Sequence, residues 1–288
     1  MSIAVILGNY NDSRFLINWV AKMASQNPDE LIIVDDRSTD NSVAVIKQLQ
    51  KQYGMIKLVL NDGPQGCFGA FVKGCQSTDA EYVASWGCDD EPGPNYIAKM
   101  KSVVKRYPLV DMFSCNAKVM REGREYERIL FPFDAYISPD YMVKICKNGM
   151  GKMVNLIGMI LKRSVLLDMW ERGGKDSIAD FDAAFAYFMM FSKGLVNLSE
   201  KLVTFRSYPN SWGARGKADE KKKAIVIAQE LFKVDMKVYD RAIESRIWGA
   251  RYQWSQKVAL WGIMKIPAWA RRIFYRWFYS YRWQIEKL

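Results

Sequence analysis

Histidine does not occur anywhere in this chain of 288 residues. Histidine therefore cannot serve as a general base here, and it cannot bind a metal ion. Any general base must instead be a carboxylate, a lysine, a tyrosine or a cysteine. A site for a hard cation must be built from oxygen ligands.

Cysteine is scarce, and its spacing shows no pairing. The chain has five cysteines, an odd number, and no two of them are separated by only two residues. We therefore expect neither a disulfide framework nor a zinc site, and the pattern is typical of a protein in a reducing cytosol. The cysteines are Cys67, Cys75, Cys88, Cys115 and Cys146.

Long apolar runs are missing as well. The run from Ile3 to Leu7 is too short for a signal peptide and has no basic flank. The longest apolar stretches, such as 258–264, fall far short of the ~20 residues that a membrane-spanning helix needs. We therefore expect a cytoplasmic protein that is soluble or bound to the inner face of the cell membrane.

Positive charge is present in excess, and it is concentrated near the C-terminus. Residues 245–288 hold nine lysines and arginines and one acid, a charge of +8, whereas the rest has 33 basic and 30 acidic residues, or +3. Apolar residues recur at helical spacing over 266–285, and six of the ten tryptophans fall within 248–283. Such a basic, aromatic helix is typical of segments that lie on an anionic membrane surface.

Two other interpretations of this segment stay open. Its apolar stripe would also serve a helix that packs on the catalytic part of the chain or on a second subunit of a homo-oligomer. Basic and aromatic residues also occur in nucleic-acid-binding proteins, but no recognised nucleic-acid motif accompanies them, so we expect no nucleic-acid partner.

Strand and helix signals alternate along the first third of the chain. Short apolar runs that predict buried strands alternate with amphipathic segments that predict helices, a pattern typical of a mainly parallel sheet covered by helices on both faces. The predicted strands are 3–7, 31–34, 56–60 and 82–86, and the predicted helices are 15–24, 43–53 and 70–75. From residue 219 the pattern is helical through about 264, and Pro267 begins a last helix.

Acidic pairs follow two of the predicted strands. Asp35-Asp36 come directly after the second strand, and Asp89-Asp90 follow the fourth. In parallel sheets, ligands bind beyond the carboxyl ends of the strands. Two adjacent carboxylates repel each other, and a divalent cation that carries a diphosphate would relieve this. Aspartate is also common in turns and helix caps, and we interpret Asp40 as part of the cap of the helix that follows.

Three segments resemble family 2 glycosyltransferases. Residues 3–11, IAVILGNYN, are similar to that family's opening strand, and residues 32–42, IIVDDRSTDNS, to its Val-Asp-Asp-Gly-Ser-Thr-Asp signature. Residues 81–94 resemble the segment that carries its Asp-x-Asp motif. The resemblance implies a GT-A fold and inverting transfer of a sugar from a nucleotide-diphosphate sugar, by default a UDP-sugar. The acceptor would be a hydroxyl of a glycan or lipid-linked acceptor in surface polysaccharide synthesis.

The resemblance also assigns roles to residues of the nucleotide site. Asp36 would accept a hydrogen bond from the base, with Asp35 beside it, and Asn9 and Tyr10 would line the same pocket. Asp90 would coordinate Mn²⁺ or Mg²⁺, while Asp89 would contact the sugar or the metal shell. The motif departs from the family pattern at Gly87, where the first aspartate of Asp-x-Asp is usually found.

Further roles fall later in the chain. Residues 177–185 resemble the segment that carries the family's catalytic base, which aligns with Asp180. Asp182 is the alternative, and both residues are also explained as acids in the first turn of a helix. Arg206 or Arg215 would stabilise the leaving diphosphate, helped by Lys217, although each is also a typical surface charge. Arg37 stands where the family usually has glycine, and it either reaches a phosphate or lies on the surface.

The expected organisation is a GT-A catalytic domain over 1–217 and a helical, basic and aromatic extension over 218–288. Within the catalytic domain, 1–100 would bind the nucleotide and 101–217 the acceptor. A nucleotidyltransferase on a similar sheet is a second hypothesis, but the glycine-rich loop with an arginine that such enzymes carry is missing from 8–11. A non-catalytic nucleotide-sugar-binding protein is the third, because of Gly87.

Overall fold

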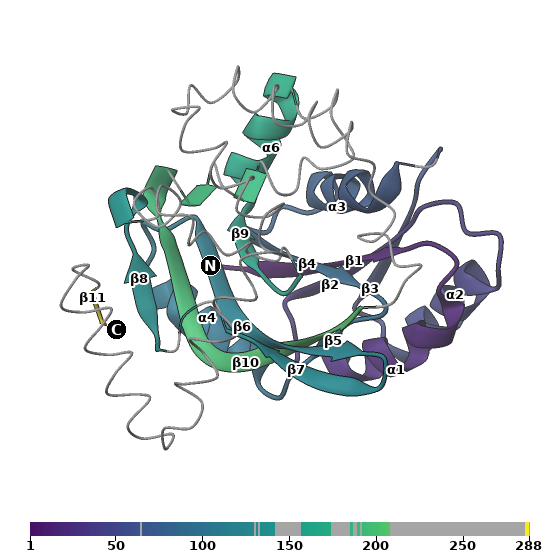
Figure 1. The fold of residues 1–288 in the computed structure, drawn as a ribbon. Coiled ribbons are helices and arrows are strands. Elements are labelled where there is room, and N and C mark those ends of the chain that lie inside the picture. Colours follow the sequence, from purple (N-terminus) through teal and green to yellow (C-terminus); the bar gives the residue numbers. More distant parts are fainter. Residues whose placement is uncertain are drawn as a thin grey trace, which may run out of the picture.

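A computed structural model shows a central sheet with helices on both faces (Figure 1). It describes residues 1–63, 65–129, 131, 133–141, 157–173, 185–186, 189–190, 192–207 and 286–287. The strands of these residues form one sheet in the order β11-β8-β10-β6-β9-β4-β1-β2-β3, with β5 beside β10 and β7 beside β6.

The first half of the chain builds the parallel part of this sheet. Its strands β1, β2, β3 and β4 are all parallel to their neighbours among these four. The strands are β1 (Ile3–Asn9), β2 (Glu30–Asp35), β3 (Ile56–Leu60) and β4 (Tyr82–Gly87), and the helices between them are α1 (Ser13–Ala24), α2 (Ser42–Gln52) and α3 (Gly66–Gln76). Each of these elements was predicted from the apolar pattern, to within four residues at either end.

The second half extends the sheet with mixed strand directions. Strand β9 runs antiparallel between β4 and β6, and β10 runs parallel to β6. The elements are β5 (Glu91–Pro92), α4 (Tyr96–Arg106), β6 (Met112–Arg121), β7 (Arg124–Arg128), β8 (Ala135–Ile137), β9 (Ile160–Lys162), α6 (Arg163–Gly173), β10 (Leu195–Ser207) and β11 (Glu286–Lys287). Both expected halves of the catalytic domain therefore belong to one sheet, which confirms the predicted α/β class.

Two apolar layers hold the helices against the sheet. Alternate residues of each strand point to opposite faces, so Ile6 belongs to the apolar cluster that includes residues of α3 and α6, whereas Val5 belongs to the cluster that includes residues of α1, α2 and α4. Figure 1 shows these two sets of helices on opposite faces of the sheet. Trp86 of β4 makes edge-to-face contacts with Trp19 of α1 and Tyr96 of α4. Such contacts fix both helices against one face of the strand that leads into the Asp89-Asp90 pair.

Asp40 caps two helices at once. Its carboxylate accepts hydrogen bonds from the backbone N–H of Ser42 at 2.9 Å and of Ser13 at 3.2 Å. These are the first residues of α2 and α1. Burial raises the pKa of Asp40, but the hydrogen bonds outweigh it and leave the pKa below its ordinary value. The predicted cap is thus confirmed, and it joins the two helices that begin at the carboxyl edge of the sheet.

No helix within the described ranges is long and apolar enough to cross a membrane. The predicted basic helix over 266–285 and the expected boundary at 217–218 lie outside those ranges. Of the extension, only β11 is described, and it adds an antiparallel strand to the edge strand β8.

Candidate active site

Three parallel strands end at the same edge of the sheet. The register pairs Asn9 of β1 with Asp35 of β2, and Gly8 of β1 with Gly87 of β4. The residues that follow these strands therefore gather at one edge, where parallel sheets bind their ligands. The structure thus brings both predicted acidic pairs to a common site.

Asp35 has a structural role within this site. Its side chain is buried, with 1% exposed. One carboxylate oxygen accepts hydrogen bonds from Asn9 Nδ2 and Ser38 Oγ, both at 2.7 Å, and the other accepts from the backbone N–H of Ser38 at 2.9 Å. Both oxygens therefore accept hydrogen bonds from within the protein. The bond from Asn9 joins the end of β2 to the end of β1, and the bonds from Ser38 hold the loop that follows β2.

Asp36 faces the opposite way and holds the start of α3. Its Oδ1 accepts from Asn61 Nδ2 at 2.7 Å and from the backbone N–H of Gln65 at 2.8 Å, and its Oδ2 accepts from the N–H of Gly66 at 2.8 Å. Two of these three donors are backbone N–H groups at the N-terminus of α3, so Asp36 ties the end of β2 to the start of that helix. Oδ2 has the smaller number of partners and retains capacity for a further donor.

Sequence reasoning missed the partners of Asp36. A signal was present for Asn61, because it directly follows the strand-forming run 56–60, as Asp35 follows its own strand. For Gln65 and Gly66 the bonds come from backbone N–H groups, which carry no side-chain signature. Gly66 itself adopts φ +70°, a conformation that favours glycine.

Arg37 takes an unusual backbone conformation beside this carboxylate. Its φ is +65°, in the left-handed region that favours glycine, which is the residue that the resembling family usually carries here. Its guanidinium donates to the backbone carbonyl of Asp62. That contact ties the loop after β2 to the loop after β3, and the side chain is exposed at the rim of the site.

Asn9 and Tyr10 differ sharply in exposure. Asn9 is buried, donates to Asp35 and Ser38, and accepts a hydrogen bond from Cys88 Sγ at 3.2 Å through Oδ1. Its side chain is therefore used within the protein, where it positions Asp35. Tyr10 is 55% exposed, so its ring is available to a ligand.

Cys88 and Cys67 are further residues of this site that sequence reasoning did not assign. The buried Cys88 thiol also donates to the carbonyl of Gly8 at 3.3 Å, and burial, followed by the charge of Asp12, raises its pKa well above the ordinary value. Cys67 is exposed at the start of α3 and lies close enough to Cys88 to act on its pKa. Cys67 directly follows Gly66, whose backbone N–H donates to Asp36, and it lies near Cys88 in the turn after β4.

The second acidic pair sits on a tight turn after β4. The backbone N–H of Asp90 donates to the carbonyl of Gly87 at 3.3 Å, and Asp90 Oδ1 accepts from the backbone N–H of Arg206 at 3.2 Å. Asp90 is 5% exposed. Burial, and then the charge of Asp89, raise the pKa of Asp90 well above its ordinary value, and Arg206 opposes them only in part.

The two carboxylates converge on one point. A Cβ atom placed on Gly87 would lie 3.0 Å from Asp89 Oδ1 and 3.3 Å from Asp90 Oδ2. Within the described residues no group of three or more potential ligand side chains is found. Two converging carboxylates supply oxygen ligands of the kind that Mn²⁺ and Mg²⁺ prefer, and the predicted cation site at Asp90 stays a prediction.

Arg206 supports this turn from strand β10. Its guanidinium donates to the carbonyl of Asp89 at 2.7 Å and to the carboxylate of Glu91, which also pairs with Lys22 at 2.6 Å. Those bonds lower the pKa of Glu91, with Lys22 as the largest cause. Arg206 therefore lies at the acidic turn, and its predicted contact with a diphosphate stays a prediction.

A third carboxylate, Asp12, faces the same turn from the loop between β1 and α1. Burial raises the pKa of Asp12 first, and the charge of Asp89 raises it further. Arg14 lies 3.7 Å away and acts in the opposite direction. The region around Asp89 is therefore strongly acidic, and a cation or a donor-rich ligand would lower its energy.

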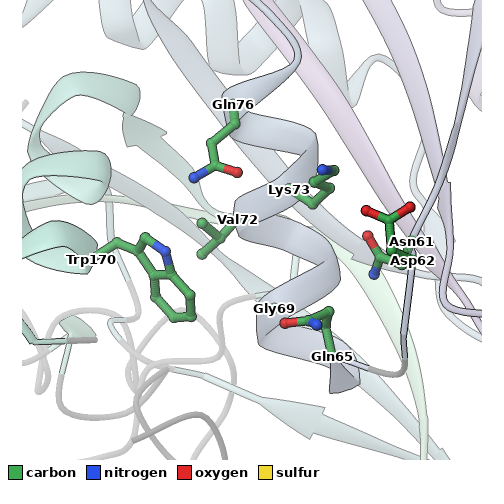
Figure 2. Close-up of a pocket in the computed structure, with 8 residues that line it drawn as sticks. All are labelled: Asn61, Asp62, Gln65, Gly69, Val72, Lys73, Gln76 and Trp170. Carbon is green, nitrogen blue, oxygen red and sulfur yellow. The ribbon is translucent and has the colours of Figure 1, made fainter. Parts of the chain in front are cut away.

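A groove of about 340 Å³ runs along α3 toward Trp170 of α6 (Figure 2). Its lining combines three side-chain amides with one lysine, one aspartate, one indole, a valine and a glycine. The lining residues are Asn61, Asp62, Gln65, Gly69, Val72, Lys73, Gln76 and Trp170. Asn61 and Gln65 also donate hydrogen bonds to Asp36, so the groove begins beside Asp36.

Several predicted site residues lie outside the described residues. These are the proposed base Asp180, its alternative Asp182, and Arg215 with Lys217. Their roles stay predictions.

Comparison with known proteins identifies the family to which the chain belongs. The model described as Glycosyl transferase family 2 matches residues 4–164, more than half of the chain. An uncharacterised glycosyltransferase of Nostoc is 36% identical over 112 residues, which cover 38% of this chain and 35% of that protein. A Methanococcus voltae protein is 25% identical over 101 residues, 33% of this chain and 31% of its own length. Its name is dolichyl N-acetyl-α-D-glucosaminyl phosphate 3-β-D-2,3-diacetamido-2,3-dideoxy-β-D-glucuronosyltransferase.

Solved structures agree with the fold. The crystal structure of S. aureus TarS 1-349 in complex with UDP-GlcNAc matches with a TM-score of 0.65 at 14% identity, over 84% of this chain and 70% of that one. The complex with UDP gives a TM-score of 0.64 at the same identity, over 84% and 69%. This chain matches only about a third of the length of the Nostoc and Methanococcus relatives.

Proposed function

This chain belongs to glycosyl transferase family 2, and on that premise we propose that it transfers a sugar from a UDP-sugar to a hydroxyl of a glycan or lipid-linked acceptor. The observation that carries the proposal is the meeting of Asp36 with the converging carboxylates of Asp89 and Asp90 at one sheet edge. In this proposal the same sheet edge would offer a carboxylate to the nucleobase and a pair of carboxylates to a cation that carries the diphosphate.

Base recognition falls to Asp36 in this proposal. A uracil ring N–H would donate to Oδ2, which has one protein donor where Oδ1 has two. Three donors within the protein hold the carboxylate in place, so it enters binding without reorganisation. The exposed ring of Tyr10 would lie against the base. UDP is the proposed nucleotide because TarS, which shares the fold, was crystallised with UDP and with UDP-GlcNAc.

Asp90 and Asp89 would hold Mn²⁺ or Mg²⁺. The ion, when bound, would neutralise the charge that develops on the leaving diphosphate. The chain's own contribution is to keep the two carboxylates converged, with Asp90 anchored to the backbone of Arg206 and Asp89 anchored through its carbonyl. Arg206 and Arg215 remain candidates for direct contact with the diphosphate.

Asp180 is the proposed general base, and the transfer is proposed to invert the anomeric configuration. A carboxylate within hydrogen-bond reach of the acceptor hydroxyl would take its proton as the oxygen attacks the anomeric carbon. Asp180→Asn should abolish transfer and leave UDP binding intact, because the amide cannot accept the proton. Transfer at the wild-type rate would refute this role, and Asp182→Asn distinguishes the alternative residue.

The groove along α3 supports a glycan as acceptor. Its side-chain amides both donate and accept hydrogen bonds, as sugar hydroxyls do, and its indole offers an apolar face. The Methanococcus relative acts, by its name, on a dolichyl-linked sugar phosphate. That similarity supports a lipid-linked acceptor, and hence a place in surface polysaccharide synthesis.

The basic segment would bring the enzyme to such an acceptor at the inner face of the membrane. Flotation with vesicles of phosphatidylcholine, with and without phosphatidylserine, tests this. The full chain should float only with the anionic vesicles, and charge reversal at Arg271, Arg272 and Arg276 should weaken flotation. Equal flotation of both proteins would contradict the membrane role and favour packing on the catalytic part or on a second subunit.

A donor screen tests the function itself. Purified protein is incubated with UDP-glucose, UDP-galactose or UDP-GlcNAc and Mn²⁺, and released UDP is measured, with EDTA as the control. EDTA-sensitive release of UDP supports the proposal. Binding of a nucleotide sugar without release, with or without an acceptor extract, would indicate a non-catalytic protein, and pyrophosphate release from UTP would indicate a nucleotidyltransferase.

A further inference from the structure

Gly87 occupies a special place in the acidic turn. It is the last residue of β4, and its carbonyl accepts the hydrogen bond that closes the turn at Asp90. Nothing in its backbone requires glycine, since its φ is not in the left-handed region. The requirement comes from the side chains above it, because Asp89 Oδ1 and Asp90 Oδ2 stand 3.0 Å and 3.3 Å from the position of its missing Cβ.

The two carboxylates differ in how easily they could move away from a side chain at position 87. Asp90 is buried and is bonded to the backbone N–H of Arg206, so its displacement would break a hydrogen bond in the interior. Asp89 is more exposed, but its backbone is held by the guanidinium of Arg206. A Cβ at position 87 would therefore require the Asp89 carboxylate to shift by a few tenths of an ångström, and a longer side chain would displace it further from Asp90.

We propose that Gly87 is a positioning residue, and that the space of its missing side chain is where Asp89 and Asp90 converge to bind a divalent cation. The inference rests on the proposed function. The Gly-Cys-Asp-Asp turn is then an alternative arrangement of two carboxylates, and an aspartate at position 87, the usual residue of the family, would disrupt it. A third carboxylate there would also stand beside a buried acid and be repelled.

The test measures how strongly Mn²⁺ and UDP bind together. Calorimetry gives the Kd of UDP with and without Mn²⁺, and the ratio reports the coupling between cation and nucleotide. Uridine binding, which needs no cation, reports the base pocket and the integrity of the fold. Wild-type protein, Gly87→Ala and Gly87→Asp are compared, and Gly8→Ala is the matched control. Gly8 pairs with Gly87 on the neighbouring strand, but its Cβ would meet only Ala70 Cβ, at 3.9 Å.

Mn²⁺ should tighten UDP binding to the wild-type protein by about tenfold or more, equivalent to about 1.4 kcal/mol. Gly87→Ala should reduce this gain, Gly87→Asp should abolish it, and Gly8→Ala should retain it, with uridine binding unchanged in all four proteins. A larger gain in Gly87→Asp than in wild type would overturn this inference alone, and an unchanged gain in Gly87→Ala would also count against it. If Mn²⁺ did not tighten UDP binding even to the wild-type protein, both this inference and the proposed cation site would be wrong. Uridine binding would still test the proposed base pocket, because it does not depend on the cation.

Discussion

Asn9 Nδ2 donates a 2.7 Å hydrogen bond to Asp35 Oδ2 across the parallel strands β1 and β2. Asp36, the next residue, points to the other side and binds Asn61 and the start of α3. Two adjacent aspartates at the end of one strand thus bind different partners and have different roles. Asp35 secures the neighbouring strand, and Asp36 presents a carboxylate at the proposed base pocket.

Asp35→Asn should destabilise the protein without a direct loss of a ligand contact. An amide nitrogen cannot accept a hydrogen bond, so at least one of the donors from Asn9 and Ser38 would lose its partner in the interior. We expect the free energy of unfolding in urea to fall by about 1–3 kcal/mol. Asp79→Asn, at a fully exposed carboxylate, is the control and should change it by less than about 0.5 kcal/mol. Equal stability of the two variants would contradict the structural role of Asp35.

Asp36→Asn should weaken nucleotide binding. The base N–H would meet a neutral amide in place of a charged carboxylate, and the amide would also face the N–H of Gly66. A hydrogen bond to a charged group contributes about 1.5–3 kcal/mol, so calorimetry should show UDP affinity reduced by roughly tenfold to a hundredfold. Asp62→Asn changes an exposed carboxylate in the neighbouring loop and should bind UDP normally. UDP affinity that is unaffected by Asp36→Asn would remove Asp36 from the base pocket.

Asp90→Asn should stabilise the cation-free protein at neutral pH. Because burial raises the pKa of Asp90 above its ordinary value of 3.8, the folded state binds the proton more tightly than the unfolded state does. The free energy of unfolding therefore falls as pH rises from about 3.8 to the raised pKa, and then becomes constant. Asparagine does not titrate, so the free energy of unfolding of the variant lacks this decrease. In EDTA, the stability of the variant relative to wild type should therefore increase as pH rises from about 3.8 to the raised pKa. The same variant should lose the effect of Mn²⁺ on UDP binding, and a variant that is less stable in EDTA at every pH would contradict this account.

Cys67 should be the first of the described cysteines to be alkylated. It is exposed, whereas burial raises the pKa of Cys75 and Cys88, and that of Cys115 to about 12. Because the thiolate is the reactive form, iodoacetamide at pH 8 should modify Cys67 well before these three. UDP should slow the reaction at Cys67, because this residue directly follows Gly66 at the proposed base pocket and lies near Cys88. Mass spectrometry of peptides measures both effects, and equal rates with and without UDP would place the nucleotide elsewhere.

The strands and helices of the first half could be predicted because their signals are local. Buried parallel strands appear as short apolar runs such as 31–34, and the amphipathic pattern of 15–24 defines a helix. The rule that ligands bind at the carboxyl edge then located Asp35-Asp36 and Asp89-Asp90. The cap at Asp40 was predictable for α2, whereas its second bond, to Ser13 of α1, depends on how the helices meet.

The division of roles within the site could not be predicted from local pattern. Asp35 and Asp36 are chemically identical, and only the direction of the strand end decides which one meets Asn9 and which one meets α3. Arg206 stands 115 residues from Glu91 in the sequence, so its contact with the acidic turn arises from the pairing of β10 with β5 and β6. Contacts between residues so far apart in the sequence produce no periodic pattern of residue types from which they could be predicted.

The sequence by itself determined the family, the α/β class and the two acidic pairs, since apolar periodicity and short motifs express them locally. Only the tertiary structure decided that Asp35 is a structural acid, that Cys88 and Arg206 support the site, and that the space above Gly87 is filled by two carboxylates. The physical reason is that these features depend on distances between chain segments brought together by the sheet, and close packing then determines which atoms share each space.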